Sequence, residues 1–483
     1  FLLKTSVLDQ MCAPLCAAIL KETDDNADDM LEHIRQANLF LIPLDNERRW
    51  FRYHHLFGDL LRKRLGQSTD IDMNVLHIRA SKWYEHHQFR GKAIQHAVAG
   101  NDYERAANLV EMTWPGFFNG VRPMTLLSWV KALPDDLVRT RPVINLAGAW
   151  TLLHEGDLEA ADYHLRNIEL WLDVSTQNQN NTGFLVFNKD ALHTLPALFA
   201  NARLYQAQAQ GNMVLAIKYG QDFLDVADAD DHYHRGFASM FLALAYWTDG
   251  NLETACQYAF DAITFMQNAQ NGYFECFSNM ILAEIYAIQG HLQKSQSQYE
   301  HALQFELDKS QFALKKLSDR HLGLALLHLE RNDLEAAKRC MQEARKESVE
   351  QAIFPGRVSR WYTVSAHIKK AEGDLDGALE QLDAAAHQFK RDVFPNIRPI
   401  EAEKVHIWIA QGNLTQAINW AHRQSLSVDD HLSYLREFEY MTLARLRMTQ
   451  GQTDDALPLL DRLFASAEAG KRQSSVIKIL VLK

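Results

Sequence analysis

Two adjacent histidines, His54 and His55, are the residues of this sequence whose types most directly suggest chemistry. They lie in FRYHHLFGDLLRKRL, residues 51–65, where an aromatic, strand-like run meets a short basic segment rich in leucine. Four interpretations are open: a metal site, part of a DNA-binding surface, a phosphate sensor, or packing. A metal site is disfavoured, because adjacent side chains point in different directions and no Cys or carboxylate partner lies at helical spacing.

The rest of the sequence offers no motif for catalysis. It contains no HExxH, GxSxG, EF-hand or dinucleotide fingerprint, so no catalytic residue and no metal ligand is assigned. The pairs His86–His87 and His232 with His234 are expected to be incidental in a chain with 21 histidines. The five cysteines show neither a CxxC nor a zinc spacing, which indicates reduced thiols in a cytoplasmic protein.

Length and charge limit the classes of protein that fit. A chain of 483 residues exceeds one core and predicts two to four domains or an elongated repeat array. The net charge of −11 argues against a nucleic-acid footprint over the whole surface. No window approaches the roughly 18–20 unbroken apolar residues of a membrane span, so no membrane partner is expected. The start, FLLKTSVLDQM, has no initiator Met and no signal-peptide pattern, which predicts a fragment of a longer chain.

The elements that must position any functional residue come from an internal repeat. Nine segments share one pattern, and they open at Asn101, Gly156, Gly211, Gly250, Gly290, Asn332, Gly373, Gly412 and Gly451. The last six intervals are 39, 40, 42, 41, 39 and 39 residues, and the first two are 55 each. Gly and Asn tolerate the left-handed conformation that ends a helix. Five positions later stand eight alanines and one serine, Ser295, which would let two antiparallel helices approach closely.

This pattern resembles the tetratricopeptide repeat, a pair of antiparallel helices joined by a tight turn. The usual repeat has about 34 residues, so a period near 40 predicts longer helices or linkers. The predicted fold is mainly α, a right-handed α-solenoid of about nine tetratricopeptide-like helix pairs; an unrelated helical bundle is the alternative. The two long intervals are attributed to a polar surface loop at residues 173–183 and to a short extra helix at Ser128–Leu133.

The first residues follow a different pattern, which predicts a small N-terminal winged-helix domain. Ser6–Leu20 has helical spacing with Pro14 inside it, residues 22–29 (ETDDNADD) read as an acidic loop, and Met30–Ala37 as a second helix. The runs LFLIPL and WFRYH flank DNERR, which predicts a two-stranded hairpin, and Leu56–Leu65 would form the helix after it.

The segments FLLKTSVL, QANLFLIPLD and FRYHHLFGDLLRKRL resemble the large ATP-dependent LuxR-type transcriptional regulators, which belong to the signal-transduction ATPases with numerous domains (STAND). The resemblance covers essentially the whole chain, and it is specific over residues 1–65. It implies a nucleotide-binding domain before the winged helix and a DNA-binding helix-turn-helix after the solenoid. This sequence departs from the family by lacking a GxxxxGK[ST] loop and any recognition helix after Leu463.

The resemblance therefore implies no cofactor in this fragment, and ATP or ADP in the full-length parent. Its expected partners are an inducer or regulatory protein, its own nucleotide-binding domain, and DNA only through a C-terminal domain absent here; the parent is expected to oligomerise. The expected domains are a winged helix at 1–66, a helical linker with an irregular first repeat at 67–135, and a tetratricopeptide-like sensor domain at 136–483.

The resemblance also gives His54 a role, since a winged-helix histidine of this ATPase class reaches the β-phosphate of bound ADP. Here His55 stands where the family usually has Asp. An imidazole can donate to a phosphate oxygen, which gives nucleotide sensing a physical basis. Packing of His54 beside Phe51 and Phe57 remains open. So does DNA contact through the locally basic residues Arg48, Arg49, Arg52, Arg62, Lys63 and Arg64.

The solenoid groove is the predicted binding surface for a ligand or partner, because such arrays expose a concave face lined by the first helix of each pair. Positions three, six and ten before each turn are expected to face it. They include Trp150, Tyr205, Gln208, Met240, Trp247, Glu284, His367, Lys370, His406, Arg445 and Met448. Aromatic platforms in the first half and polar or cationic groups in the second suit a small ligand such as a sugar, or a peptide. The competing function is a protein–protein interaction scaffold with no small-molecule ligand.

Overall fold

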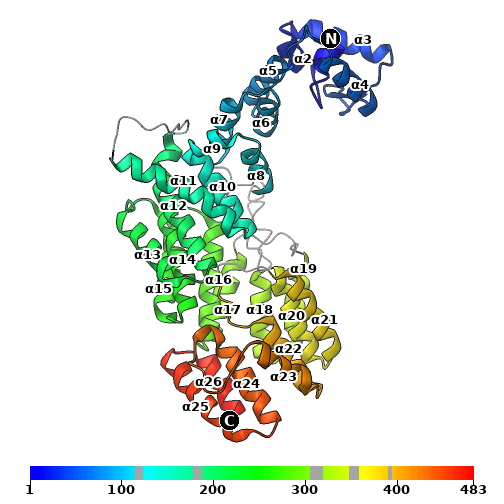
Figure 1. The fold of residues 1–483 in the computed structure, drawn as a ribbon. Coiled ribbons are helices and arrows are strands. Elements are labelled where there is room, and N and C mark those ends of the chain that lie inside the picture. Colours follow the sequence, from blue (N-terminus) through cyan, green and yellow to red (C-terminus); the bar gives the residue numbers. More distant parts are fainter. Residues whose placement is uncertain (115–122, 178–186, 188, 305–318, 347–357, 390–393) are drawn as a thin grey trace. The chain divides into compact units, whose positions relative to one another are not determined.

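The computed structural model describes the chain except for residues 115–122, 178–186, 188, 305–318, 347–357 and 390–393. In the described part, the structure is almost entirely helical and holds one two-stranded sheet (Figure 1). The chain forms two compact units: residues 1–151 with 166–195, and residues 152–165 with 196–483. The expected boundaries at residues 66 and 135 both fall inside the first unit.

The first unit begins with the predicted winged helix. Its elements are α1 (Leu2–Thr5), α2 (Ala13–Leu20), α3 (Asp24–Gln36), β1 (Leu41–Pro43), β2 (Phe51–Tyr53) and α4 (His55–Gly66). The strands pair antiparallel with Ile42 opposite Arg52. Met11 and Phe51 exchange two backbone hydrogen bonds of 2.8 Å, which adds a third, single-residue rung to the sheet. The buried hydroxyls of Thr5 and Tyr53 lie 2.8 Å apart and tie the first helix to the hairpin.

Two details of the predicted winged helix were wrong. The continuous helix expected at Ser6–Leu20 is broken, because Met11 pairs with the hairpin and Pro14 lies in the first turn of α2, where its missing N–H costs nothing. The expected acidic loop forms the first turns of α3. Thr23 caps this helix by accepting from the Asn26 amide, and its acidic residues lie at the positive end of the helix dipole.

Helices continue through the rest of the first unit. They are α5 (Met73–His86), α6 (Arg90–Ala99), α7 (Tyr103–Thr113), α8 (Pro123–Lys131), α9 (Asp135–Arg139), most of α10 (Pro142–Glu155), and parts of α11 (Leu158–Gln177) and α12 (Lys189–Ala209). The extra helix predicted at Ser128–Leu133 is α8, which begins earlier. The polar loop predicted at residues 173–183 is helical through Gln177, and its remainder lies outside the described residues.

The second unit consists of helix pairs from α12 onward. They are α13 (Met213–Val226), α14 (His232–Asp249), α15 (Leu252–Asn268), α16 (Gly272–Ile288), α17 (Leu292–Gln304), α18 (Asp319–Glu330), α19 (Leu334–Lys346), α20 (Val358–Ala371), α21 (Leu375–Gln388), α22 (Ile400–Ala410), α23 (Leu414–Arg423), α24 (Glu437–Thr449), α25 (Thr453–Ala469) and α26 (Gln473–Leu482), with a 3₁₀ turn η5 at Tyr434–Arg436. Consecutive helices pack on each other, as in α14 with α15 and α20 with α21 (Figure 1). The fold is the predicted solenoid of helix pairs.

The repeat pattern in the sequence has a direct structural cause. All nine opening residues have a positive φ, from 55° at Asn101 to 89° at Gly250. All nine small residues five positions later are fully buried, and Ser295 donates its hydroxyl to the Ala283 carbonyl across the helix pair at 2.7 Å. The period near 40 arises in part from long helices, since α15 and α16 have 17 residues each.

The second unit brings together residues that are far apart in sequence. Trp247 on α14 donates its indole N–H to the Tyr434 hydroxyl at 3.0 Å. The guanidinium of Arg472 lies 5.2 Å from the ring centre of Tyr434, and α26 packs on α16. The last helix pairs therefore return to the middle of the solenoid, and this return carries α26 to the site described next.

Candidate functional site

A cavity of about 530 Å³ lies along the first helices of consecutive pairs near the C-terminal end of the solenoid. We call it the C-terminal pocket. Its walls come from α18, α20, α22 with the segment before it, α24 and α26; the residues are Leu326, Leu329, Glu330, His367, Lys370, Ala371, Arg398, Glu403, His406, Phe438, Met441, Arg445, Lys478 and Leu482. Four of the predicted groove residues, His367, Lys370, His406 and Arg445, meet here.

Helical spacing explains why these side chains converge. His367 and Lys370 are three residues apart on α20, as are Glu403 and His406 on α22, so each pair shares one helix face. The turns at the ends of the helix pairs place these faces side by side. The pocket is therefore built mainly by the first helices of the pairs, α18, α20, α22 and α24, together with α26.

Glu403 is the buried acidic group of the C-terminal pocket. Its side chain is 7% exposed, and its Oε1 lies 3.3 Å from His367 Nε2 and 3.8 Å from Arg398 Nε. Burial would raise the pKa of Glu403, but His367 and Arg398 outweigh burial and hold this pKa below its usual range. Glu403 is therefore an anion with Arg398 and His367 at ion-pair distance, although its Oε1 makes no hydrogen bond within the described part of the chain.

His406 and Phe438 form an aromatic wall. Their rings stack with centroids 5.1 Å apart and planes 7° from parallel, and His406 Nε2 lies 2.9 Å from the Thr442 hydroxyl. Burial lowers the pKa of His406 to about 3, so this ring is neutral at physiological pH. The guanidinium of Arg398 lies 5.3 Å from the Phe438 ring centre, which holds a cation at the edge of an apolar surface.

Positive charge is in excess in the C-terminal pocket. Lys478 is paired with Glu330 at 2.9 Å, and Arg398 lies beside Glu403. Lys370 and Arg445, by contrast, make no ion pair within the described part of the chain. Burial lowers the pKa of both, and Arg445 and Arg398 lower that of Lys370 further while Glu403 opposes them. Lys370, Arg398, Arg445 and Lys478 thus bring four cations to the pocket, against the two carboxylates of Glu330 and Glu403.

The other predicted groove residues do not join this pocket. Trp150, Tyr205, Gln208, Met240 and Trp247 are all buried at 5% exposure or less. The positions counted back from each turn thus point between neighbouring helices in this part of the chain, and the expected aromatic platforms present almost no surface to a ligand. Glu284 on α16 forms an ion pair with Arg360 on α20. The charge of Glu284 is therefore neutralised within the fold.

Sequence reasoning missed several residues of the C-terminal pocket. Arg398 precedes α22 and therefore lies outside the helical count, and Lys478 reaches the site only because the last pairs return to the middle of the solenoid. Glu403 could have been found, because it lies one helical turn before His406 on a helix already assigned to the groove. Met448 is half-buried against the core of the last helices rather than part of the pocket.

The winged helix places His54 at the start of α4. Its backbone amide donates to the Phe40 carbonyl at 2.8 Å, and its half-buried ring lies 4.3 Å from the His55 ring and 6.4 Å from that of Phe40. Among the described residues, the ring nitrogens of His54 make no hydrogen bond. Phe57 packs on Tyr53 and Phe40 instead.

Two further interpretations concern this stretch, a metal site and DNA contact. No group of three His, Cys, Asp or Glu side chains in the described ranges could hold a metal ion. Arg62, one of the basic residues considered for DNA contact, pairs with Asp59 at 2.8 Å and Asp9 at 3.7 Å. Its guanidinium also donates to the Ser6 carbonyl at 3.1 Å, so Arg62 holds the domain together.

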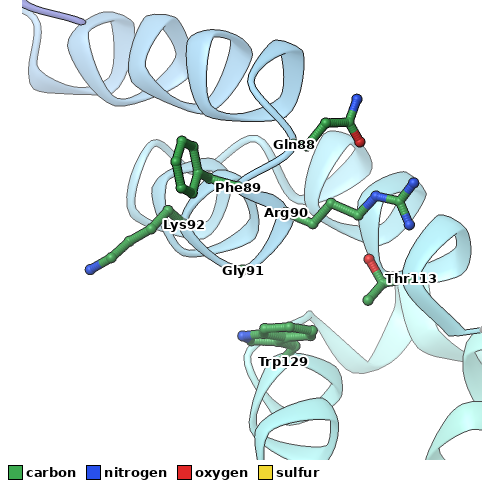
Figure 2. A pocket seen from close by; sticks show the side chains of 7 residues that line it. All are labelled: Gln88, Phe89, Arg90, Gly91, Lys92, Thr113 and Trp129. Atoms are coloured by element: carbon green, nitrogen blue, oxygen red, sulfur yellow. The ribbon is translucent and has the colours of Figure 1, made fainter. Parts of the chain in front are cut away.

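A second cavity, of about 600 Å³, lies in the first unit beside α6 and α8 (Figure 2). Trp129 faces Gly91, where an added Cβ would come within 3.3 Å of the indole. Its cations already have partners, since Lys92 reaches Asp9 at 3.5 Å and Arg90 donates to the Met112 carbonyl at 3.4 Å. This cavity therefore offers an apolar surface without free charge.

No helix in the described residues is both long enough and apolar enough to cross a membrane. The C-terminal pocket lies wholly within a region, residues 197–483, that matches the family described as the MalT-like TPR region. Residues 1–71 match the MalT winged helix domain. Together these matches cover the winged helix and all the repeats from α12 onward.

Several known proteins are similar along most of the chain. The serine/threonine-protein kinase PknK of Mycobacterium tuberculosis is 26% identical over 418 residues, 85% of this chain and 36% of that protein. The HTH-type transcriptional regulator MalT of Vibrio campbellii is 25% identical over 489 residues, 97% of this chain and 50% of that protein. A STAND protein with a tetratricopeptide repeat sensor from Pyrococcus horikoshii has the same fold, with a TM-score of 0.50, 14% identity, and coverage of 98% of this chain and 64% of that one.

The chain spans about a third to a half of the length of these curated relatives. The regions matched are of winged-helix and tetratricopeptide type, in the order that the fold shows. The TPR match alone covers more than half of the 483 residues. The chain therefore belongs to the MalT-like family, in which it corresponds to the winged-helix domain and the TPR region.

Proposed function

We propose that this chain is the signal-sensing region of an ATP-dependent LuxR-type transcriptional regulator, and that the C-terminal pocket is its ligand site. The observation that carries the proposal is the construction of the pocket. One cavity receives side chains from the first helices of consecutive pairs and from α26. Its volume falls in the range of about 300–1,000 Å³ typical of small-molecule sites.

A ligand in this pocket would contact several helix pairs at once and would therefore affect the curvature of the solenoid. A ligand that contacts α18, α20, α24 and α26 together favours whichever curvature brings these helices to their bound spacing. It shifts the equilibrium of the regulator only by its difference in affinity between the two shapes. In the full-length protein, the shift would favour an open, ATP-bound and oligomerising state.

The nucleotide would be held by the regulator's own nucleotide-binding domain, since this sequence has no phosphate-binding loop. The residue available here is His54, whose ring could donate a hydrogen bond to a phosphate oxygen. The winged helix would thus report the bound nucleotide to the solenoid. DNA would be bound by a further C-terminal domain, as in regulators of the helix-turn-helix class.

The proposal is tested by a thermal-shift screen of sugars and other small metabolites on the chain. A ligand at 100-fold its dissociation constant should stabilise by about 2.7 kcal/mol. Ala371 is exposed on the pocket wall, so Ala371→Trp should fill the cavity and abolish the shift. Ala386→Trp, at an exposed position of α21 outside the pocket, is the matched control.

A hit that stabilises the wild type and the Ala386→Trp variant but not Ala371→Trp supports the C-terminal pocket. The proposal fails if hits stabilise all three proteins equally. It also fails if no compound stabilises the chain and affinity purification recovers a stable protein partner that Ala371→Trp still binds. That second result would favour the interaction scaffold.

A further inference from the structure

We propose that the ligand of the C-terminal pocket is a small organic anion, whose carboxylate or phosphate head pairs with Lys370 and Arg445 and whose apolar body lies against Phe438 and Met441. The inference rests on the proposed function, because it names the chemical class of ligand for the same pocket. Four observations carry it: the unpaired cations, their burial, the paired state of the carboxylates, and the apolar wall.

Two cations of the C-terminal pocket have no ion-pair partner within the part of the chain that the structure describes. Lys370 on α20 and Arg445 on α24 both line the cavity, and neither makes an ion pair to any residue that the structure describes. The Nε of Arg445 is buried and has no hydrogen-bond partner. A charged group removed from water without a partner is costly, so such groups are retained where a partner arrives from outside.

The carboxylates of the pocket form no ion pair with Lys370 or Arg445, because they pair with other groups. Glu403 is already held by His367 and Arg398, and Glu330 is held by Lys478. Lys370 and Arg445 therefore leave an excess of two positive charges facing the cavity. An arginine fork and an ammonium group that line one cavity suit the planar or tetrahedral oxygens of a carboxylate or phosphate.

The remaining wall selects for an organic ligand over a bare inorganic ion. Leu326 and Leu329 from α18, Phe438 and Met441 from α24, and Leu482 from α26 give the cavity an apolar lining. His406 is neutral and stacked on Phe438, so it adds to this surface. A neutral sugar would leave both unpaired cations without a counter-charge, which disfavours it relative to an anion of similar size.

The experiment measures melting temperature against probe concentration for the whole chain. Phenyl phosphate and phthalate serve as aromatic phosphate and carboxylate probes, phthalamide as the neutral counterpart, and sodium chloride at equal ionic strength as the salt control. We expect saturable stabilisation by at least one of the two anions and none by phthalamide. Which anion binds more tightly distinguishes phosphate from carboxylate as the natural head group.

Matched variants locate the binding. Lys370→Gln and Arg445→Gln should each raise the apparent dissociation constant by about tenfold or more, the value of a charge-assisted hydrogen bond. Lys369→Gln and Arg447→Gln are the controls, since these neighbours on the same helices bond to Asp374 and to Gln450 and Gln452. Both controls should bind as the wild type does.

Three results would overturn the inference: no anion exceeds sodium chloride, phthalamide stabilises as well as phthalate, or the pocket and control variants respond alike. These outcomes can be separated from failure of the proposed function. If the anions fail while a neutral hit is lost in Ala371→Trp, the pocket senses a ligand of another class. If no compound depends on Ala371, both proposals fall together.

Discussion

Replacing Lys370 with methionine should stabilise the chain in the absence of ligand, although it removes a charged residue from a polar site. Lys370 lies in the C-terminal pocket, and burial together with Arg445 and Arg398 lowers its pKa. Folding therefore disfavours the charged form of this side chain. Methionine keeps most of the length and apolar surface while it removes the charge.

The expected gain in the free energy of unfolding is taken from other substitutions that relieve an unfavourable charge. Relieving an unfavourable charge typically contributes about 0.5–2 kcal/mol, and we expect Lys370→Met to fall in this range. Lys369→Met should act in the opposite direction, since it breaks the ion pair in which Lys369 Nζ lies 2.7 Å from Asp374 Oδ2. Replacing either of these two adjacent lysines with methionine is thus expected to change the free energy of unfolding in opposite directions.

The difference in stability between Lys370→Met and the wild type should change with pH in a defined direction. Because the folded-state pKa of Lys370 is depressed, the cost of its charge is fully present below that pKa. The cost disappears as pH rises toward the ordinary value of 10.5. The advantage of Lys370→Met should therefore be largest near neutral pH and shrink as pH rises toward 10.5.

The assay is urea unfolding followed by circular dichroism at pH 7 and pH 10.5, with both variants and the wild type in the same buffer. The reasoning is refuted if Lys370→Met is less stable than the wild type at pH 7, since Lys370 would then have a favourable partner. It is equally refuted if the two lysine variants shift stability in the same direction.

Three further predictions address other parts of the molecule. Stability should fall as pH drops from about 6.5 toward 4, because burial holds the pKa of His406 at about 3 and the unfolded chain takes up its proton first; His406→Gln should flatten this slope in urea titrations. Tyr434→Phe removes the hydrogen bond from Trp247, so it should cost about 0.5–1.5 kcal/mol in urea unfolding, and unchanged stability would argue against this contact. His54→Ala in the full-length regulator should speed ADP release while leaving the melting temperature of this chain unchanged, and unaltered ADP retention would remove His54 from the nucleotide site.

The repeat could be predicted from the sequence because its physical constraints are local. A left-handed residue such as Gly250 must end the first helix, and a small residue such as Ala255 must lie at the crossing. These two requirements place Gly or Asn and a small residue at a fixed spacing in every repeat, independently of the surrounding sequence. The winged helix was recognisable for a similar reason, although the cap at Thr23 and the bridge at Met11 changed its details.

The candidate site was only partly predictable. Counting back from each turn identifies one face of a helix, but whether a neighbouring pair covers that face depends on the packing of the solenoid. The count therefore selected His367 and Arg445, which line the pocket, together with Met240, which is fully buried. Lys478 could not be found by any local rule, since long-range packing brings it to the pocket.

The most direct test of the central claim is hydrogen–deuterium exchange on the chain with and without the strongest stabilising compound of the screen. The account predicts slower exchange in α18, α20, α22, α24 and α26, the helices that contribute to the C-terminal pocket. Protection confined to other helices, or a stabilising compound that leaves exchange in these five unchanged, would contradict it.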